Sequence, residues 1–251
     1  MGTIQMDNLV KRYGGGDSAV MAVRGISVEI QSGKLIAIMG ESGSGKSTLL
    51  SMMGALNTPT SGKYRVDEID VYALNQEERA DFRRKFLGFV FQSFHLIPYL
   101  TARENVMLPL APVKKKGKGK RAMADDALAR VGLVKKAHRL PSQISGGEQE
   151  RVAIARAIVN NPPILLADEP TGNLDSRTGR EIMDLLKALN SDGMTIVMVT
   201  HNSECAEYAG KILRLSDGLL VEEERVGRGE ENPPPLPEKE KKLMAVASLY
   251  R

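Results

Sequence analysis

The segment from Lys34 to Leu56 constrains the fold more than any other part of the 251-residue chain. An apolar run, KLIAIM, passes directly into the loop GESGSGKST, which matches the pattern G-x-x-x-x-G-K-[ST], and the helical pattern STLLSMMGAL follows. A strand, such a loop and a helix in that order are the context in which the pattern predicts a phosphate-binding loop. We therefore expect an α/β protein of the P-loop NTPase type, with a mostly parallel sheet covered on both faces by helices.

Several residues of this loop are expected to bind the phosphates of a nucleotide. Glycines allow the backbone to wrap so that its N–H groups face phosphate oxygens, and Lys46 brings a positive charge to the β- and γ-phosphates. The hydroxyl of Ser47 can ligate Mg²⁺. The nucleotide-binding residues predicted in the loop are Gly40, Ser42, Gly43, Gly45, Lys46, Ser47 and Thr48.

A second apolar run, in ILLADEP, ends in two carboxylates. Asp168 is expected at the C-terminal end of a buried strand, where open α/β sheets place their ligands, and would hold Mg²⁺ directly or through water. Glu169 follows it and can polarise a water molecule against the γ-phosphate. The alternative is that the two carboxylates cap the next element, but their combination with Lys46 favours the catalytic interpretation.

Composition excludes several classes of protein. Cys205 is the single cysteine, so no internal disulfide can form, which favours a reducing, cytosolic setting. No run approaches the ~20 apolar residues that a membrane span needs, and the N-terminus lacks the apolar core of a signal peptide. The net charge of +4 is mild, and the dense basic run from Lys114 to Arg121 is interpreted as a solvated loop. Contact of this run with anionic lipid or nucleic acid is the alternative, although nucleic acid is not an expected partner.

The order of strand and helix patterns predicts a core with an insertion. Strand patterns at SVEI, YRVDEIDVY and FLGFVF come first, and TARENVMLPL and RAMADDALARVGL then carry helical patterns, the former with a capping-box spacing. Strands return at ILLA and TIVMVT, and KILRLSDGLLVEE predicts a hairpin that turns at Asp217-Gly218. The expected units are a core of residues 1–91 and 156–227, an inserted helical subdomain of residues 92–155 and a Pro-rich charged tail of residues 228–251.

The stretch SGGEQERVAIARAI, from Ser145 to Ile158, carries a second phosphate-binding signal. A hydroxyl and two glycines precede an amphipathic helix, which is the pattern of an anion site at a helix N-terminus. A protein with one nucleotide pocket has no evident use for a second site so far from Lys46 in the sequence.

The motifs GESGSGKST, SGGEQ, ILLADEP, GNLD and VTHN, in this order, resemble the nucleotide-binding subunit of an ABC transporter over roughly residues 1–225. The resemblance implies a RecA-like core with an antiparallel β subdomain, ATP and Mg²⁺ as ligands, and ATP hydrolysis. It also explains the second signal. Two copies would face head to tail, and Ser145, Gly146 and Gly147 of one copy would cap the γ-phosphate held by Lys46 of the other. Glu148 stands where many relatives have Gln and is expected to point away from the triphosphate.

The resemblance implies roles for further residues. His201 would contact the γ-phosphate and, with Glu169, orient the attacking water, and Gln92 would reach Mg²⁺ or that water. Asp175, in GNLD, would lie in the loop that crosses the dimer interface, and Tyr13 would stack on adenine, unless it is only a partly buried surface residue. The implied catalytic residues are Lys46, Gln92, Glu169 and His201, and the implied metal-binding residues are Ser47, Gln92 and Asp168.

Two longer stretches, LGFVFQSFHLIPYLTARENVMLPL and ADEPTGNLDSRTGREIMDLL, resemble the bacterial LolD/MacB/FtsE group. This resemblance implies a peripheral ATPase at the cytoplasmic face of the cell membrane, which drives an integral membrane permease in lipoprotein release or in peptide or macrolide efflux. The alternative is an FtsE-like ATPase that regulates a membrane or cell-wall partner without transport. The segment ENPPPLPEKEKK would suit a linker to membrane helices in a MacB-like chain, but a free subunit with a separate permease is preferred.

Overall fold

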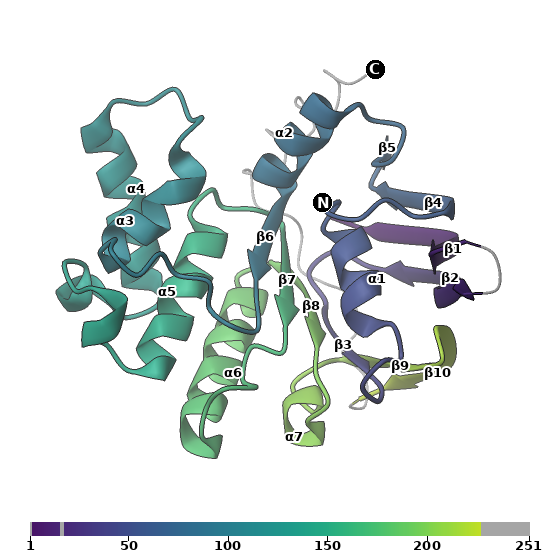
Figure 1. Ribbon diagram of the computed structural model, residues 1–251. Coiled ribbons are helices and arrows are strands. Elements are labelled where there is room, and N and C mark those ends of the chain that lie inside the picture. Colours follow the sequence, from purple (N-terminus) through teal and green to yellow (C-terminus); the bar gives the residue numbers. More distant parts are fainter. Residues whose placement is uncertain (1, 16–17, 227–251) are drawn as a thin grey trace.

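The computed structural model describes residues 2–15 and 18–226, which contain two sheets (Figure 1). The larger sheet has the order β10-β9-β3-β8-β7-β6, and its neighbours are parallel except for the antiparallel pair β9 and β10. The smaller sheet, β2-β1-β4-β5, is antiparallel throughout. The strands are β1 (Ile4–Tyr13), β2 (Val20–Ile30), β3 (Leu35–Met39), β4 (Ser61–Val66), β5 (Ile69–Asp70), β6 (Leu87–Val90), β7 (Ile164–Asp168), β8 (Thr195–Val199), β9 (Lys211–Ser216) and β10 (Leu219–Arg225). This architecture confirms the predicted α/β fold with a mostly parallel sheet and an antiparallel β subdomain.

The central strands of the larger sheet are buried on both faces. In β3, Leu35, Ala37 and Met39 belong to one hydrophobic cluster, whereas Ile36 and Ile38 belong to another. The same alternation divides the residues of β7 and β8 between the two clusters. Since successive side chains of a strand point to opposite faces, an unbroken apolar run such as LIAIM is what a doubly covered strand requires.

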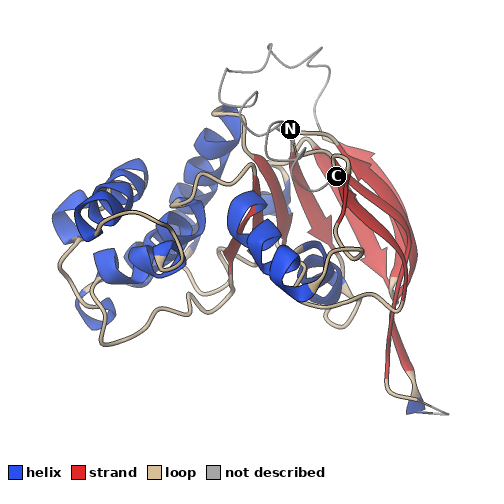
Figure 2. Ribbon diagram, turned by 90° about the horizontal axis from the view of Figure 1, so that it is seen from above, coloured by secondary structure: helices blue, strands red, loops and turns tan. Residues whose placement is uncertain are grey.

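Helices cover the sheets, and three of them form a lobe beside β6. Figure 1 shows α3, α4 and α5 together on one side of β6, and the same group lies to the left in Figure 2. Contacts of α5 with α3, α4 and β6 join this lobe to the larger sheet. The helices are α1 (Lys46–Met53), α2 (Gln76–Phe86), α3 (Ala102–Met107), α4 (Gly117–Arg130), α5 (Gly146–Ile158), α6 (Ser176–Ser191) and α7 (Ser203–Ala206), with short 3-10 turns η2 (Leu108–Leu110), η3 (Val134–Lys136) and η4 (Pro141–Gln143).

Local signals in the sequence are matched by local structure at several points. Thr101 and Glu104 form the expected capping box at the start of α3. The hairpin of β9 and β10 turns at Asp217 and Gly218, both of which have a positive φ. The predicted tail of residues 228–251 lies outside the described residues.

Two predictions were wrong in detail. The pattern YRVDEIDVY forms a tight hairpin, β4 and β5, because Asp67 adopts a positive φ and the chain reverses there. The basic run is only partly a loop, since α4 begins at Gly117 within it, although its side chains are mostly exposed as expected.

Candidate nucleotide-binding site

The phosphate-binding loop joins β3 to α1 and depends on glycine at two close approaches. A Cβ atom on Gly45, whose φ is +97°, would lie 2.2 Å from the carbonyl oxygen of Ala22. A Cβ atom on Gly40 would lie 2.2 Å from the carbonyl oxygen of Leu215. Neither carbonyl oxygen can move without shifting a strand, so only glycine fits at these two positions of the loop.

The start of α1 provides the charge that a triphosphate needs. Lys46 is buried, and its Nζ donates to the carbonyl oxygens of Gly40, at 2.8 Å, and Glu41, at 2.6 Å. Gly45 is the N-cap and contributes no side-chain cap, and the first turn contains no acidic residue. Free N–H groups, the positive end of the helix dipole and a held ammonium group together form an anion site that fits phosphate.

A hydroxyl and a carboxylate meet beside this loop, as magnesium binding would require. The Oγ of Ser47 donates to Oδ1 of Asp168 at 3.3 Å, although the residues are 121 positions apart. Burial raises the pKa of Asp168, while the hydrogen bond from Ser47 and the charge of Lys46 oppose that shift. Mg²⁺ is commonly bound by one or two protein oxygens together with phosphate oxygens, so this pair fits the ion.

Glu169 is the centre of the predicted catalytic group. Its φ of +47° is in the left-handed region, and its N–H donates to the carbonyl oxygen of Val199 at 3.0 Å, which keeps it bonded to the neighbouring strand β8 just past the end of β7. Its Oε2 accepts a hydrogen bond of 3.0 Å from Nε2 of Gln92, and its Oε1 lies 3.0 Å from Nδ1 of His201. The glutamate side chain is 19% exposed and the histidine 67%, so the group opens to solvent on the histidine side.

These residues come from the carboxyl ends of adjacent strands. In sheet order, the phosphate loop follows β3, His201 follows β8, Asp168 ends β7 and Gln92 follows β6. The parallel arrangement therefore brings together four segments that are far apart in the sequence. In the structure Ser47 contacts Asp168, and Gln92 and His201 both contact Glu169, while Lys46 is the first residue of α1.

The second anion signal is not joined to the first. The hydroxyl of Ser145 caps α5 by accepting from the N–H of Glu148 at 3.2 Å. The carboxylate of Glu148 in turn accepts from the N–H of Ser145 at 2.9 Å. Figure 1 shows α5 separated from α1 by β6, β7 and β8. Within the described residues, no hydrogen bond connects the stretch Ser145–Gly147 to the phosphate loop. Glu148 turns back onto its own helix start and lies 3.5 Å from Lys136.

Asp175 and Tyr13 lie at the ends of their elements. Asp175 caps α6, and hydrogen bonds from Thr178 lower its pKa. Tyr13 ends β1 with 44% exposure, and the Lys11 ammonium lies 4.9 Å from its ring centroid. An exposed ring at a strand end is suited to stacking, but in the described structure no hydrogen bond ties it to the phosphate loop.

Two residues that the sequence did not single out bond to the backbone of the segment from Gln92 to His95. Asn173 donates from Nδ2 to the carbonyl oxygen of Gln92 at 2.7 Å, and Arg156 donates to the carbonyl oxygens of Phe94 and His95. Arg156 lies in an ordinary amphipathic helix, so no local pattern distinguishes it from a surface residue.

Comparison with known proteins agrees with the geometry. Residues 23–172 match the family model described as ABC transporter. The chain is 48% identical over 219 residues to the ABC transporter ATP-binding protein MJ1508 of Methanocaldococcus jannaschii, covering 87% of this chain and 98% of that protein. It is 42% identical over 219 residues to the macrolide export ATP-binding/permease protein MacB of Rhodopseudomonas palustris, covering 87% of this chain but only 34% of MacB.

A solved structure shares the fold. The ATP-binding cassette MJ0796, determined as a dimer in a post-hydrolysis state bound to ADP and Pi, superimposes with a TM-score of 0.82 at 45% identity, over 90% of this chain and all of that one. The resemblance to MacB-type cassettes drawn from the sequence is thereby confirmed. This chain belongs to the ABC transporter ATP-binding family, and it binds ATP with Mg²⁺ and hydrolyses the nucleotide.

Proposed function

We propose that two copies of this chain close head to tail around ATP, each completing the other's site. The observation that supports this most directly is the separation of Ser145, Gly146 and Gly147 from the phosphate loop of the same chain, across three strands of the sheet (Figure 1). The N-terminus of α5 is suited to bind an anion, and the γ-phosphate of the ATP held by a second copy would supply it. The dimeric state described for MJ0796 is consistent with this arrangement.

Catalysis in this proposal depends on positioning and charge. The phosphates would be held by Gly40, Ser42, Gly43, Gly45, Lys46, Ser47 and Thr48, and Tyr13 would stack on the base. Ser47, Asp168 and Gln92 would hold Mg²⁺, which neutralises phosphate charge when bound. Glu169 would accept a hydrogen bond from the attacking water, and His201 would fix the orientation of that carboxylate. Asp175 would meet the second copy.

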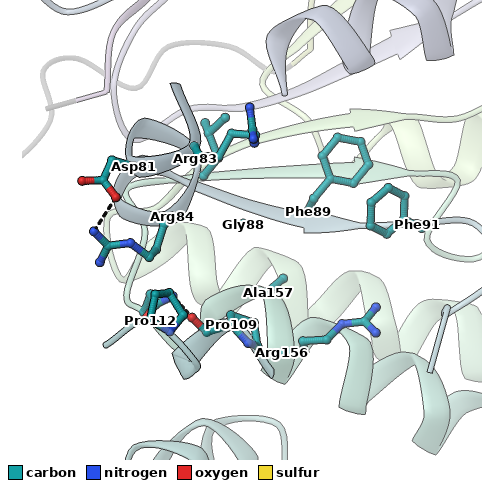
Figure 3. Close-up of a pocket in the computed structure, with 13 residues that line it drawn as sticks. Asp81, Arg83, Arg84, Gly88, Phe89, Phe91, Pro109, Pro112, Arg156 and Ala157 are labelled. Carbon is teal, nitrogen blue, oxygen red and sulfur yellow. Dashed lines mark hydrogen bonds and ion pairs between the residues drawn. The ribbon is translucent and has the colours of Figure 1, made fainter. Parts of the chain in front are cut away.

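A groove of about 500 Å³ lies between α2 and β6 on one side and the η2 segment and the C-terminal part of α5 on the other (Figure 3). Phe89 and Phe91 lie on its β6 side, and Pro109 and Pro112 lie opposite. Arg83, Arg84 and Arg156 also line it, and of these Arg84 is paired with Asp81 at 2.8 Å. We propose that this groove receives a short helix of a membrane permease, with apolar residues facing the phenylalanines and an acidic residue facing the arginines.

The relatives support a permease as the occupant. MacB proteins are described as combined ATP-binding and permease proteins, and this chain spans about a third of their length. Within the residues that the structure describes, no helix is both long and apolar enough to cross a membrane. We propose a peripheral subunit at the cytoplasmic face of the cell membrane that drives a separate permease of the LolD/MacB type, in lipoprotein release or in peptide or macrolide efflux. In this proposal residues 92–155 move as the helical subdomain against the core of residues 1–91 and 156–227.

Site-specific photocrosslinking tests the proposed partner. A photoreactive residue would replace Pro112 in the groove or, as the matched control, Val221, which is 59% exposed on β10. Irradiation in membranes of the source cell should link position 112, and not position 221, to one integral membrane protein with several spanning helices. Adducts at position 112 with soluble proteins alone would contradict a permease partner.

A further inference from the structure

The turn that follows Gln92 has a costly backbone conformation. Phe94 and His95 have φ values of +57° and +47°, so two consecutive residues with side chains occupy the left-handed region. Non-glycine residues rarely adopt this region, and they persist there only where surrounding contacts impose it. The contacts that hold this turn are therefore informative.

Arg156, from α5, provides two of these contacts. Its guanidinium donates to the carbonyl oxygen of Phe94 at 2.6 Å and also to that of His95. Burial lowers the pKa of Arg156, but the ordinary value for arginine is so high that the group stays charged. A charged two-pronged donor in a partly buried setting makes strong hydrogen bonds, so the turn is held from α5.

Gln92, two residues before the turn, is bonded to Asn173 and Glu169. Its carbonyl oxygen accepts from Asn173, and its side chain donates to Glu169. The Phe94–His95 turn therefore lies between Gln92, which is bonded to the catalytic Glu169, and Arg156 of α5. Arg156 therefore contacts the backbone within two residues of Gln92.

Arg156 also lines the proposed permease groove. Figure 3 shows its side chain extending from α5 on the side of the groove where Phe91 lies, and Phe91 packs edge-on against His95 with 5.2 Å between ring centroids. One guanidinium thus touches both the groove and the strained turn.

We propose that Arg156 is a positioning residue for ATP hydrolysis, which holds the Phe94–His95 turn and thereby keeps Gln92 within reach of Glu169. The proposal rests on the catalytic roles proposed for Gln92 and Glu169.

The test compares Arg156→Gln with Arg151→Gln in the full chain. Arg151 is a matched control because it lies on the same helix, is partly buried, and donates to the carbonyl oxygen of Val131 and to Glu181, away from the turn. Arg156→Gln should lower kcat about tenfold or more while KM for ATP changes by a clearly smaller factor, because the phosphate loop, Ser47 and Asp168 stay in place and only Gln92 is displaced from Glu169. Arg151→Gln should lower thermal stability to a similar degree while kcat stays within about twofold of wild type.

Two rescues separate positioning from folding. Arg156→Lys should recover part of kcat, because an ammonium can still donate to one carbonyl oxygen. Phe94→Gly with His95→Gly, added to Arg156→Gln, should also recover part of kcat, because glycine adopts the left-handed region without a clamp. Equal kcat losses in the two arginine variants, or no recovery with the glycines, would overturn the proposal. Glu169→Gln, measured in parallel, tests the underlying catalytic assignment separately, since retained turnover there would refute that assignment alone.

Discussion

The Nε2 atom of Gln92 lies 3.0 Å from Oε2 of Glu169, and the two residues are 77 positions apart in the sequence. Glu169 reaches this contact through a backbone with φ of +47°, which an ordinary strand end would not give. The carboxylate is thus shared between Gln92 and His201, one on each side. These two contacts fix the orientation of the carboxylate within the fold.

Replacement of Glu169 by glutamine should separate binding from turnover. The amide keeps the size of the side chain but cannot act as a base, so we expect ATP binding to persist while hydrolysis falls about a hundredfold to a thousandfold. The ATP-bound dimer should then accumulate, and size-exclusion chromatography with ATP would detect it. A variant that stays monomeric with saturating ATP at every protein concentration would argue against the sandwich dimer.

Mixing two inactive variants should restore activity. Ser145→Ala and Lys46→Ala each disable both sites of a homodimer, but a mixed dimer has one site with Lys46 from one chain and Ser145 from the other. Since half of the dimers in an equal mixture are mixed, about a quarter of wild-type phosphate release is expected.

The control for this mixing carries both changes in one chain. That double variant should gain nothing when mixed with either single variant, because every shared site then lacks a component. Equal, measurable phosphate release from Ser145→Ala mixed with Lys46→Ala and from Ser145→Ala mixed with the double variant would show that each chain hydrolyses ATP alone.

The two glycines that open α5 should respond differently to alanine. A Cβ atom on Gly147 would lie 2.3 Å from Cγ2 of Thr178, whose hydroxyl is bonded to Asp175, whereas one on Gly146 would meet only Leu174 at 3.6 Å. Gly147→Ala should therefore lower the free energy of unfolding by about 1–3 kcal/mol, and Gly146→Ala by much less. Urea unfolding at a fixed pH measures both, and equal losses would show that α6 yields to the added methyl group.

Glu150 should make the stability of the chain depend on pH. This residue of α5 is buried, one of its oxygens has no hydrogen-bond partner within the described structure, and burial raises its pKa to about 8, against the opposing charge of Arg156. The folded state holds this proton more tightly than the unfolded state, so the contribution is complete below about pH 4.5 and is lost as the pH rises through 8.

Glu150→Gln should remove this dependence. Compared with wild type, the variant should gain a few kcal/mol in the free energy of unfolding at pH 9 and little at pH 5, because glutamine stays neutral throughout. Denaturant titrations at the two pH values give the comparison. Parallel stability curves for the two proteins would mean that Glu150 titrates normally.

Features that depend on neighbouring residues were predictable from the sequence. The phosphate loop is specified by a contiguous pattern from Gly40 to Ser47, and the capping box of Thr101 and Glu104 lies within one helical turn. Asp168 and Glu169 follow a run of apolar residues long enough to identify a buried strand. In each case the physical cause lies within a few positions of the residue.

Features that depend on distant packing were not predictable. Strand β1 was missed because IQMDNLVKRY breaks its alternation, as the register shifts near Asn8 and Leu9 show. Helix α2 was missed because QEERADFRRKF is almost wholly polar, and only Phe82 and Phe86 are buried. The role of Arg156 depends on two carbonyl groups more than sixty residues earlier, at Phe94 and His95. Only the folded arrangement shows that they meet.

The strand order of the larger sheet has a consequence for how the chain folds. β3 and β6 come early in the sequence, yet β7 and β8 lie between them in the sheet. An incomplete chain that ends before Ile164 would have a two-strand gap at the place where the reaction occurs. ATP can therefore bind fully only when the sheet is complete. Its binding would stabilise the completely folded chain and have little effect on the stability of the first half of the chain.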